Sequence, residues 1–298
     1  MSIASDRVAE VEAGIRRVLA PNAGPMTHHG TNTYLVGLRD IMVIDPGPLL
    51  DEHISLIQKA TEGAQISHIL ITHAHLDHSQ SARHLANETG ATIVAYGDAD
   101  AGRRSIMTEL ANSGEIGGGE GVDFGFQPHR EVSQDNVIRN SEVELVTHHI
   151  PGHFSGHLGF ELLDTMFCGD HVMDWSTSIV SPPDGHVGDF LDSCRHLISR
   201  NPKRCLSGHG EELLDPVGRL EWLIAHRMER EGQILDVLGE KPMELEDLVA
   251  RVYADVPRSL YPAASRNLLA HLIDLWERGL VTVSPKLSLD AKFTRTSG

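Results

Sequence analysis

Short apolar runs alternate with amphipathic stretches along the first part of the chain. Residues 33–36 and 41–44 are apolar runs separated by four residues that include Gly37, and this pattern predicts a β-hairpin. Apolar positions at helical spacing follow from Asp51 onward. The same reading predicts a strand over residues 68–72, a helix over 79–87 that ends at Gly90, and a strand over 92–96. Because strands alternate with helices, we expect an α/β layered fold.

The pattern becomes more helical after about residue 215. Before that point we expect a glycine-rich loop over residues 113–130, a helix over 190–198, and strands over 143–146, 158–163, 166–168 and 205–207. After it, helical patterns cover residues 220–238, 244–253 and 263–277, and a strand over 280–283 precedes Pro285. Three helices and a strand are the order of a winged-helix module. We therefore predict a larger α/β domain over residues 1–215 and a winged-helix-like domain over residues 216–298.

Charge and composition narrow the classes of protein to which the chain can belong. The net charge is −17, of which residues 1–215 carry −16 and residues 216–298 carry −1. Such an acidic balance argues against tight nonspecific binding to nucleic acid or anionic membranes. The sequence has no apolar run of about 18 residues, and its polar start does not resemble a signal peptide. We expect a cytoplasmic protein without disulfides, since its three cysteines form no C-x-x-C pair.

Histidine is unusually frequent, with 19 residues, and several lie in short clusters with acidic side chains. The clearest cluster is the motif T-H-A-H-L-D-H over residues 72–78, directly after a predicted strand. Residues two apart point the same way in an extended chain, so His73 and His75 are placed to bind one metal ion. Asp77 and His78 then fall at the start of the next helix, whose positive end favours an anionic group.

Three further residues complete the ligand set that such a site needs. Each follows a predicted strand and a glycine: His153 in Pro-Gly-His, Asp170 in Gly-Asp and His209 in Gly-His-Gly. A catalytic zinc takes about three protein ligands and keeps one position open for water. The sequence provides two such sets and a carboxylate to bridge them, namely His73, His75 and His153, then Asp77, His78 and His209, with Asp170 between.

Two metal ions about 3.5–4 Å apart lower the pKa of a bridging water, and the resulting hydroxide attacks a carbonyl or a phosphorus. Asp77 is our candidate catalytic residue, because a carboxylate there can accept the proton of the nucleophile and pass it to the leaving group. Zinc is the metal we expect in both sites, and iron and manganese accept the same histidine and aspartate ligands.

With these motifs the sequence resembles the metallo-β-lactamase superfamily. The resemblance spans residues 15–210 and rests on Asp45 in I-D-P-G, the 73–78 cluster, and the segments around His153, Asp170 and His209. It implies an αββα sandwich with the metal ions at one edge between two sheets. The tail resembles the winged-helix-tailed branch, which includes lactamase-B-like endoribonucleases and many bacterial hydrolases. The resemblance to glyoxalase II covers the same ligands but not the tail.

The resemblance also departs from the true β-lactamases. Their best-known subclass resembles H-x-H-x-D-R with a cysteine at the second metal, whereas His78 and Asp170 stand at those places here. Antibiotic hydrolysis is therefore not the main role that we expect.

Other polar and aromatic residues near the motifs are expected to support the site or to line the substrate cleft. Asp45 is expected to be a buried acid that orients the histidine loop. We expect His148 and His149 to be structural, and His157 to pack and hydrogen-bond rather than to contact substrate. Candidate residues of the substrate cleft are residues 176–177 and 181–186, with Trp175 and Tyr261 as aromatic contacts.

Three classes of function are compatible with such a site. Hydrolysis of a small ester, thioester or lactone comes first, because the surface is acidic and the tail is not basic. A single-strand endoribonuclease is the alternative that the tail resemblance favours. A third class is an iron-dependent sulfur dioxygenase or a noncatalytic metal protein. We expect residues 216–298 to shape the active-site cleft or a homodimer interface, although arginines at 219, 227, 230, 251, 258 and 266 could form one basic face.

Overall fold

The computed structural model describes residues 7–239 and 241–296, and it places two β-sheets face to face in the first 210 residues. The first sheet has seven strands in sequence order, and the second has five in the order β12-β11-β10-β9-β8. The first comprises β1 (Val8–Glu12), β2 (Ile15–Leu19), β3 (Asn32–Val36), β4 (Asp40–Ile44), β5 (Gln65–Leu70), β6 (Thr92–Ala95) and β7 (Arg130–Glu131). The second comprises β8 (Val137–Arg139), β9 (Glu144–His149), β10 (Leu158–Leu162), β11 (Thr165–Gly169) and β12 (Arg204–Ser207).

Strand β4 shows how the sequence builds the layers. It is buried on both faces, and successive side chains of a strand point to opposite sides. Ile41 and Val43 pack in the core that includes the outer helices, whereas Met42 and Ile44 pack in the core between the two sheets. The predicted hairpin is confirmed, because β3 and β4 pair antiparallel.

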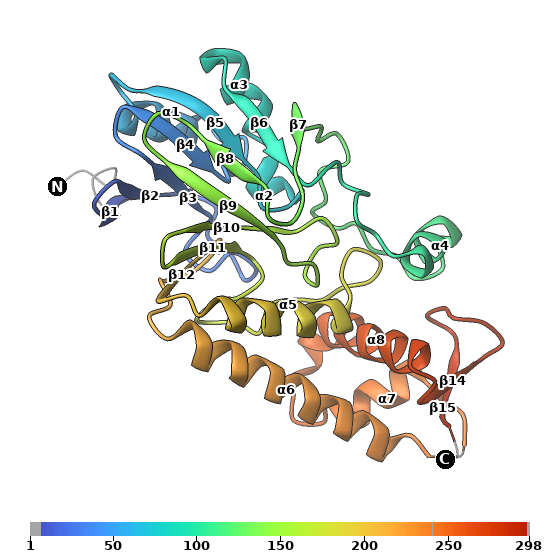
Figure 1. Ribbon diagram of the computed structural model, residues 1–298. Coiled ribbons are helices and arrows are strands. Elements are labelled where there is room, and N and C mark those ends of the chain that lie inside the picture. Colours follow the sequence, from blue (N-terminus) through green and yellow to red (C-terminus); the bar gives the residue numbers. More distant parts are fainter. Residues whose placement is uncertain (1–6, 240, 297–298) are drawn as a thin grey trace.

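Helices cover the outer face of each sheet. Helices α1 (Asp51–Ala60) and α3 (Ala82–Thr89) lie on the first sheet, and α5 (Val187–Arg200) packs on the second (Figure 1). The layer order is therefore helix, sheet, sheet, helix, which confirms the predicted αββα sandwich. Two short helices complete this region, α2 (Leu76–Ser79) and α4 (Ser105–Ser113).

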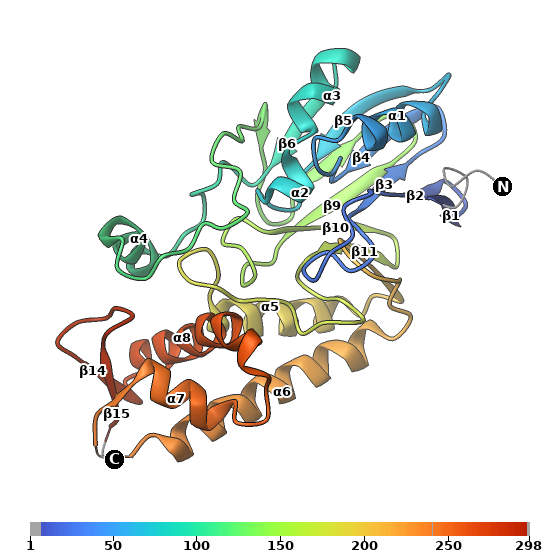
Figure 2. The same ribbon diagram turned by 180° about the vertical axis from the view of Figure 1, so that it is seen from behind.

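The rest of the chain forms a helical unit with a small sheet, and the predicted winged-helix domain is confirmed. The long helix α6 (Pro216–Val237) and α8 (Tyr261–Glu277) both pack against α5, as Figures 1 and 2 show. The sheet has the order β13-β15-β14. The remaining elements are β13 (Met243–Glu244), α7 (Leu245–Val252), the 3-10 turn η2 (Arg258–Leu260), β14 (Val281–Ser284) and β15 (Lys292–Arg295).

The apolar core of this C-terminal unit does not end at the boundary that we predicted at residue 215. Met107 and Leu110 of α4, together with Ile116, belong to the same buried cluster as α7 and α8. The division at 215/216 thus stays a prediction, but segments from both sides of it pack together. Among the described residues, we find no helix with the length and hydropathy needed to cross a bilayer.

The helix predicted over residues 79–87 was wrong in its bounds. Two helices occupy the region, because the chain breaks at Gln80 and Ser81 between α2 and α3. The Ser81 hydroxyl donates to the carbonyl of Pro48 at 2.7 Å, and its amide donates to the carbonyl of Gly47. Such side-chain bonds to distant backbone compete with continuous helix and cannot be read from helical spacing. Helix α4 and strand β15 were also not predicted.

Candidate metal centre

The two histidines of the strongest motif lie just beyond the end of β5, and His153 reaches them from the loop after β9. His73 Nε2 lies 2.9 Å from His75 Nδ1, and His153 Nε2 lies 3.2 Å from the same atom. All three ligand nitrogens fall within 4.8 Å of one another. Three imidazole nitrogens at this spacing are the kind and number of protein ligands that one catalytic metal ion takes.

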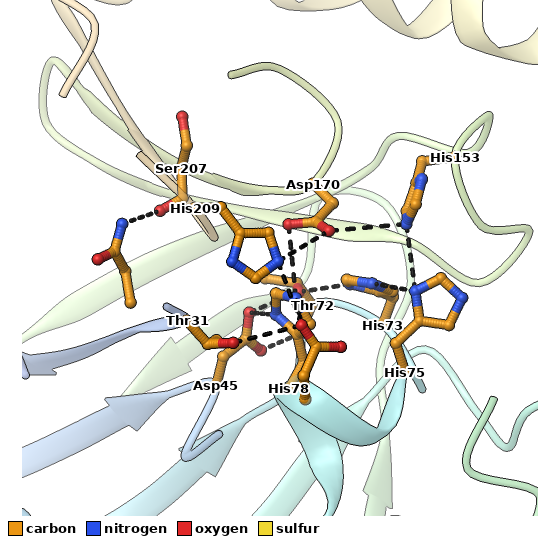
Figure 3. Close-up of polar contacts among 12 residues, drawn as sticks. Thr31, Asp45, Thr72, His73, His75, His78, His153, Asp170, Ser207 and His209 are labelled. Carbon is orange, nitrogen blue, oxygen red and sulfur yellow. Dashed lines mark hydrogen bonds and ion pairs between the residues drawn. The ribbon is translucent and has the colours of Figure 1, made fainter. Parts of the chain in front are cut away.

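A second group forms beside the first from α2 and from the ends of β11 and β12. His209 Nε2 lies 3.2 Å from Asp77 Oδ2. It also lies 3.3 Å from Asp170 Oδ2, a contact that Figure 3 marks with a dashed line. His78 Nε2 lies 3.5 Å from the same oxygen of Asp77. Asp170 Oδ2 is also 3.8 Å from His153 Nε2. Asp170 therefore lies between the two groups, where a bridging carboxylate would lie.

The second nitrogen of several histidines is held by a fixed acceptor. Asp45 Oδ2 accepts from His78 Nδ1 at 2.9 Å, and the carbonyl of Gly30 accepts from His209 Nδ1 at 3.2 Å. The carbonyl of Ile179 accepts from His153 Nδ1 at 2.6 Å. Each bond leaves Nε2 directed at the cluster, which is how metal-binding histidines are usually oriented.

Asp45 also connects this cluster to the strand that precedes it. It is 2% exposed, and its two oxygens accept from the amide and the hydroxyl of Thr72 at 2.8 and 2.6 Å. Thr72 directly precedes His73, so Asp45 binds both ends of the histidine motif. This position agrees with the orienting role expected from the sequence.

Two glycines make room for the cluster. A Cβ at Gly208 would lie 2.4 Å from Asp170 Oδ1 and 2.6 Å from His78 Cε1. Gly169 has a φ of +46°, and a Cβ there would lie 2.7 Å from the Thr72 hydroxyl. The Gly-Asp and Gly-His pairs are therefore steric requirements of the site, because only glycine lets the strands end this close together.

The two groups differ in their electrostatics. Burial, reinforced by neighbouring His153, lowers the pKa of His75 to about 3, so the three-histidine group is neutral. At His209 burial acts in the same direction, but the charge and hydrogen bond of Asp170, with Asp77, raise the pKa to about 9. Metal binding at the second group must then displace a proton from His209, because a ligand nitrogen has to be free.

The residues present fit metal ions. His78 Nε2 and Asp170 Oδ1 are buried polar atoms without a hydrogen-bond partner in the described part of the chain, and they face each other at 3.4 Å. Burying a polar atom without a partner costs free energy of folding. A metal ion would be the partner of both atoms, because His78 and Asp170 belong to the predicted ligand set. The seven residues predicted from the sequence all lie in this cluster, namely His73, His75, Asp77, His78, His153, Asp170 and His209.

The cluster opens into a cavity of about 440 Å³. His75, Asp77, His153, Asp170 and His209 lie in its wall, and Ser181 and Asp184 from the predicted cleft segment join them. Trp175 and Tyr261, which we proposed as aromatic contacts, are not among the lining residues. His157 is buried behind the site, where its Nε2 accepts from the Asp170 amide at 3.2 Å.

Several residues of the site were not predicted. The hydroxyl of Thr31 donates to Asp77 Oδ2 at 3.3 Å, and Arg266 and Ala263 of α8 line the cavity. Thr31 precedes an apolar strand and resembles any turn residue in sequence. Arg266 lies 57 residues beyond the last motif, so no spacing rule connects it to the site.

This fold, with a histidine and aspartate cluster at one edge of two facing sheets, defines a hydrolase of a known architecture. Residues 26–209 match the metallo-beta-lactamase superfamily, and the chain belongs to it. Residues 245–286 match the beta-lactamase associated winged helix domain. The superfamily is metal-dependent, typically with two metal ions.

Relatives of known name cover most of the chain. A "Beta-lactamase-like protein 2 homolog" from Drosophila melanogaster is 28% identical, over 96% of this chain and 95% of that one. An "Atrochrysone carboxyl ACP thioesterase" from Claviceps purpurea is also 28% identical, over 83% and 74% of the two chains.

Solved structures extend the similarity to the whole fold. A metallo-beta-lactamase family protein from Thermus thermophilus has a TM-score of 0.76 at 20% identity, over 96% of this chain and all of that one. A beta-lactamase domain protein from Burkholderia ambifaria has the same TM-score at 19% identity, over 97% and 93% of the chains.

Proposed function

We propose that this protein is a dinuclear metal hydrolase that cleaves a small thioester. The observation that carries the proposal is the pair of ligand groups on either side of Asp170, in the wall of one cavity. His73, His75 and His153 would hold one ion, and the other ion would take Asp77, His78 and His209. Zinc suits these nitrogen and carboxylate ligands, and imidazole nitrogens also suit iron.

When bound, the two ions supply an activated water and polarise the acyl oxygen. The residues of the chain do the rest. Asp77 accepts the proton of the attacking water and returns it to the thiolate that leaves. The Thr31 hydroxyl holds the Asp77 carboxylate in place through its bond to Oδ2. His78 and His209 outweigh the effect of burial and keep the pKa of Asp77 below its ordinary value, so the carboxylate is ionised before reaction.

The substrate class rests on the cavity and the relatives together. A volume of about 440 Å³ is in the range of small-molecule sites. Met26, Ile179 and Ala263 provide apolar lining for an acyl group beside the ligand residues. Several relatives carry the name of acyl carrier protein thioesterases. An ester or lactone is chemically close, but a thioester is the class that these names favour.

The ribonuclease alternative gains no support from the C-terminal arginines. Arg219, Arg227 and Arg266 donate to backbone carbonyls of the catalytic region, and Arg230 donates to the Val252 carbonyl. An arginine whose donors are used inside the protein is a poor contact for phosphate.

The test combines metal analysis with a substrate panel. We expect protein purified without chelator to carry about two metal ions per chain and to hydrolyse acyl thioesters faster than matched oxyesters, lactones or labelled single-stranded RNA. The His209→Ala variant should lose one ion and most of the activity. His84→Ala is the matched control, because His84 is exposed and pairs with Glu88. One ion per chain, or cleavage of RNA without thioester hydrolysis, would overturn the proposal.

A further inference from the structure

Three arginines of the C-terminal helices converge on one segment of the catalytic region, residues 173–182. Arg219 of α6 donates to the carbonyls of Met173 and Ser176 at 2.9 and 2.8 Å. Arg227 of α6 donates to Ser178 and Thr177, and Arg266 of α8 donates to Ser181 and Pro182. This segment contains no helix or strand. Its carbonyls therefore lack the donors that regular structure supplies, and the arginines provide them.

The same segment holds two of the proposed ligands from behind. The Ser178 hydroxyl donates to the carbonyl of Asp170, and the carbonyl of Ile179 accepts from His153 Nδ1. Ser178 has a φ of +55°, a backbone region that non-glycine residues rarely adopt. Such a conformation persists only where its surroundings fix it. Here the donor to the Ser178 carbonyl is Arg227, at 2.9 Å.

Arg227 is the central member of this arrangement. It is 2% exposed, and its guanidinium lies 4.4 Å from the centroid of the Phe190 ring. Its Nη1 donates to Asn267 Oδ1 at 3.1 Å. No carboxylate pairs with Arg227 among the described residues. Burying a cation without a counter-charge costs free energy of folding. We explain the burial of Arg227 by its two contacts with backbone carbonyls, which fix the segment that holds Asp170 and His153.

We propose that Arg227 is a positioning residue that orients Asp170 and His153 through residues 177–179. Helix α6 thereby sets the geometry of the metal centre, which makes the C-terminal helices part of the active site and not an appended module. The inference rests on the proposed function only in that Asp170 and His153 are taken as metal ligands. Arg219 and Arg266 hold the two ends of the same segment.

The planar fork of arginine is what the geometry requires. Arg227 Nη2 reaches two adjacent carbonyls while Nη1 reaches Asn267. Lysine carries the same charge on a single ammonium group and cannot reproduce that arrangement. Arg227→Lys therefore removes the positioning contacts and leaves the net charge unchanged.

The test measures metal affinity, not turnover. We expect Arg227→Lys to weaken Zn²⁺ binding by about 10-fold to 100-fold in a chelator competition, as the loss of groups that orient ligands does elsewhere. The visible spectrum of the Co²⁺-substituted protein should shift, because the ligand geometry changes. Arg230→Lys is the matched control. Arg230 lies one turn along α6 and stacks on Tyr253 at 4.3 Å, but its bond goes to Val252 inside the C-terminal unit.

Each outcome decides the inference. If Arg227→Lys binds Zn²⁺ as the wild type does and keeps its Co²⁺ spectrum, the positioning role is refuted. If that variant does not fold, Arg219→Lys replaces it, since Arg219 is only half-buried and holds the same segment. Unchanged affinity in Arg219→Lys then overturns the inference. If the wild type binds two ions but hydrolyses no thioester, only the proposed substrate class is refuted. If the wild type binds no metal, the proposed function and the positioning role of Arg227 are both refuted.

Discussion

Residues 7–215 and residues 216–296 both bury charged and polar side chains, but the two regions partner them differently. In the first, histidines and aspartates from four strand ends face one another at a single edge. In the second, Arg227 is buried on α6, and His271 and Asp274 are buried on α8. Arg227 turns its donors to the other region, and Asp274 pairs with Arg278 at 2.9 Å.

The difference separates two reasons for burying a polar group. At the sheet edge the groups gather because a metal ion binds several ligands at once, so the pattern is dense and local. In the C-terminal unit the buried groups have separate partners, because Arg227 donates to the catalytic region and Asp274 pairs with Arg278. A substitution of the same kind should therefore have a large effect on chemistry in the first region and an effect on docking or stability in the second.

The largest expected effect is on turnover. Asp77→Asn should lower the turnover rate by about 10²-fold or more, because a group that moves the proton is removed. The fold should survive, since the Asp77 side chain is 27% exposed. Asp274→Asn is the counterpart in the other region and should leave the rate near that of the wild type. Steady-state kinetics of the two variants at matched metal content compare them, and equal losses would remove the distinction between the regions.

The next effect is on metal affinity. Asp45→Asn should weaken Zn²⁺ binding by about 10-fold to 100-fold, because the carboxylate that accepts from His78 Nδ1 loses its charge. Asp40→Asn is the control, because Asp40 begins β4 and Asp45 directly follows its end. Asp40 accepts from Ser141 at 2.7 Å, far along the strand from the cluster. Chelator competition measures the Zn²⁺ affinity of both variants. Similar affinities would show that Asp45 stabilises only its own turn and does not orient His78.

The ligand cluster could be predicted from sequence because its chemistry imposes spacing. Metal ligands need defined residue types at strand ends, and Gly208 and Gly169 are required by contacts that leave no space for a Cβ. The alternation that placed Met42 and Ile44 between the sheets is equally local. In each case the sequence within a few residues contains the constraint.

The contacts of the C-terminal helices could not be predicted in the same way. Arg227 binds backbone carbonyls about 50 residues earlier, and carbonyls have no sequence signature. The net charge argued against a basic face, but side-chain identity alone left open that some of six arginines of this region share one. The break between α2 and α3 was missed for a related reason, because its cause is a bond from Ser81 to the backbone of Pro48.

A smaller effect is expected on stability at acid pH. His271 of α8 is 1% exposed, and neither ring nitrogen has a hydrogen-bond partner in the described part of the chain. Burial, helped by the charge of Arg227, lowers its pKa from 6.5 to about 3. Below pH 6.5 the unfolded chain therefore binds a proton that the folded chain does not. As the pH is lowered from about 6.5 to about 3, the free energy of unfolding should therefore decrease. The decrease expected from this group is about 1.4 kcal/mol per pH unit.

Replacing His271 by leucine isolates that contribution. Leucine keeps an apolar side chain of comparable size and cannot take up a proton. Urea unfolding of the metal-free wild type and of His271→Leu at pH 7 and pH 5 should show a stability difference that shifts in favour of the variant at the lower pH. Parallel curves at both pH values would mean that His271 is protonated or solvated in the folded protein.

The smallest expected effect is the binding of RNA, which should be close to absent. Phosphate contacts need free cations on one face, and each contact adds to the dependence of affinity on salt. Of the six arginines that we considered for a basic face, four already bind backbone or side-chain oxygens within the protein, namely Arg219, Arg227, Arg230 and Arg266. The region as a whole carries a charge of −1, next to a catalytic region at −16.

Titrating labelled single-stranded RNA with the whole chain at low salt should therefore give weak binding with a shallow salt dependence. Submicromolar binding that weakens steeply as salt is added, and that Arg251→Ala or Arg258→Ala reduces, would mean that this region presents a basic face after all. The ribonuclease alternative would then rank above thioester hydrolysis.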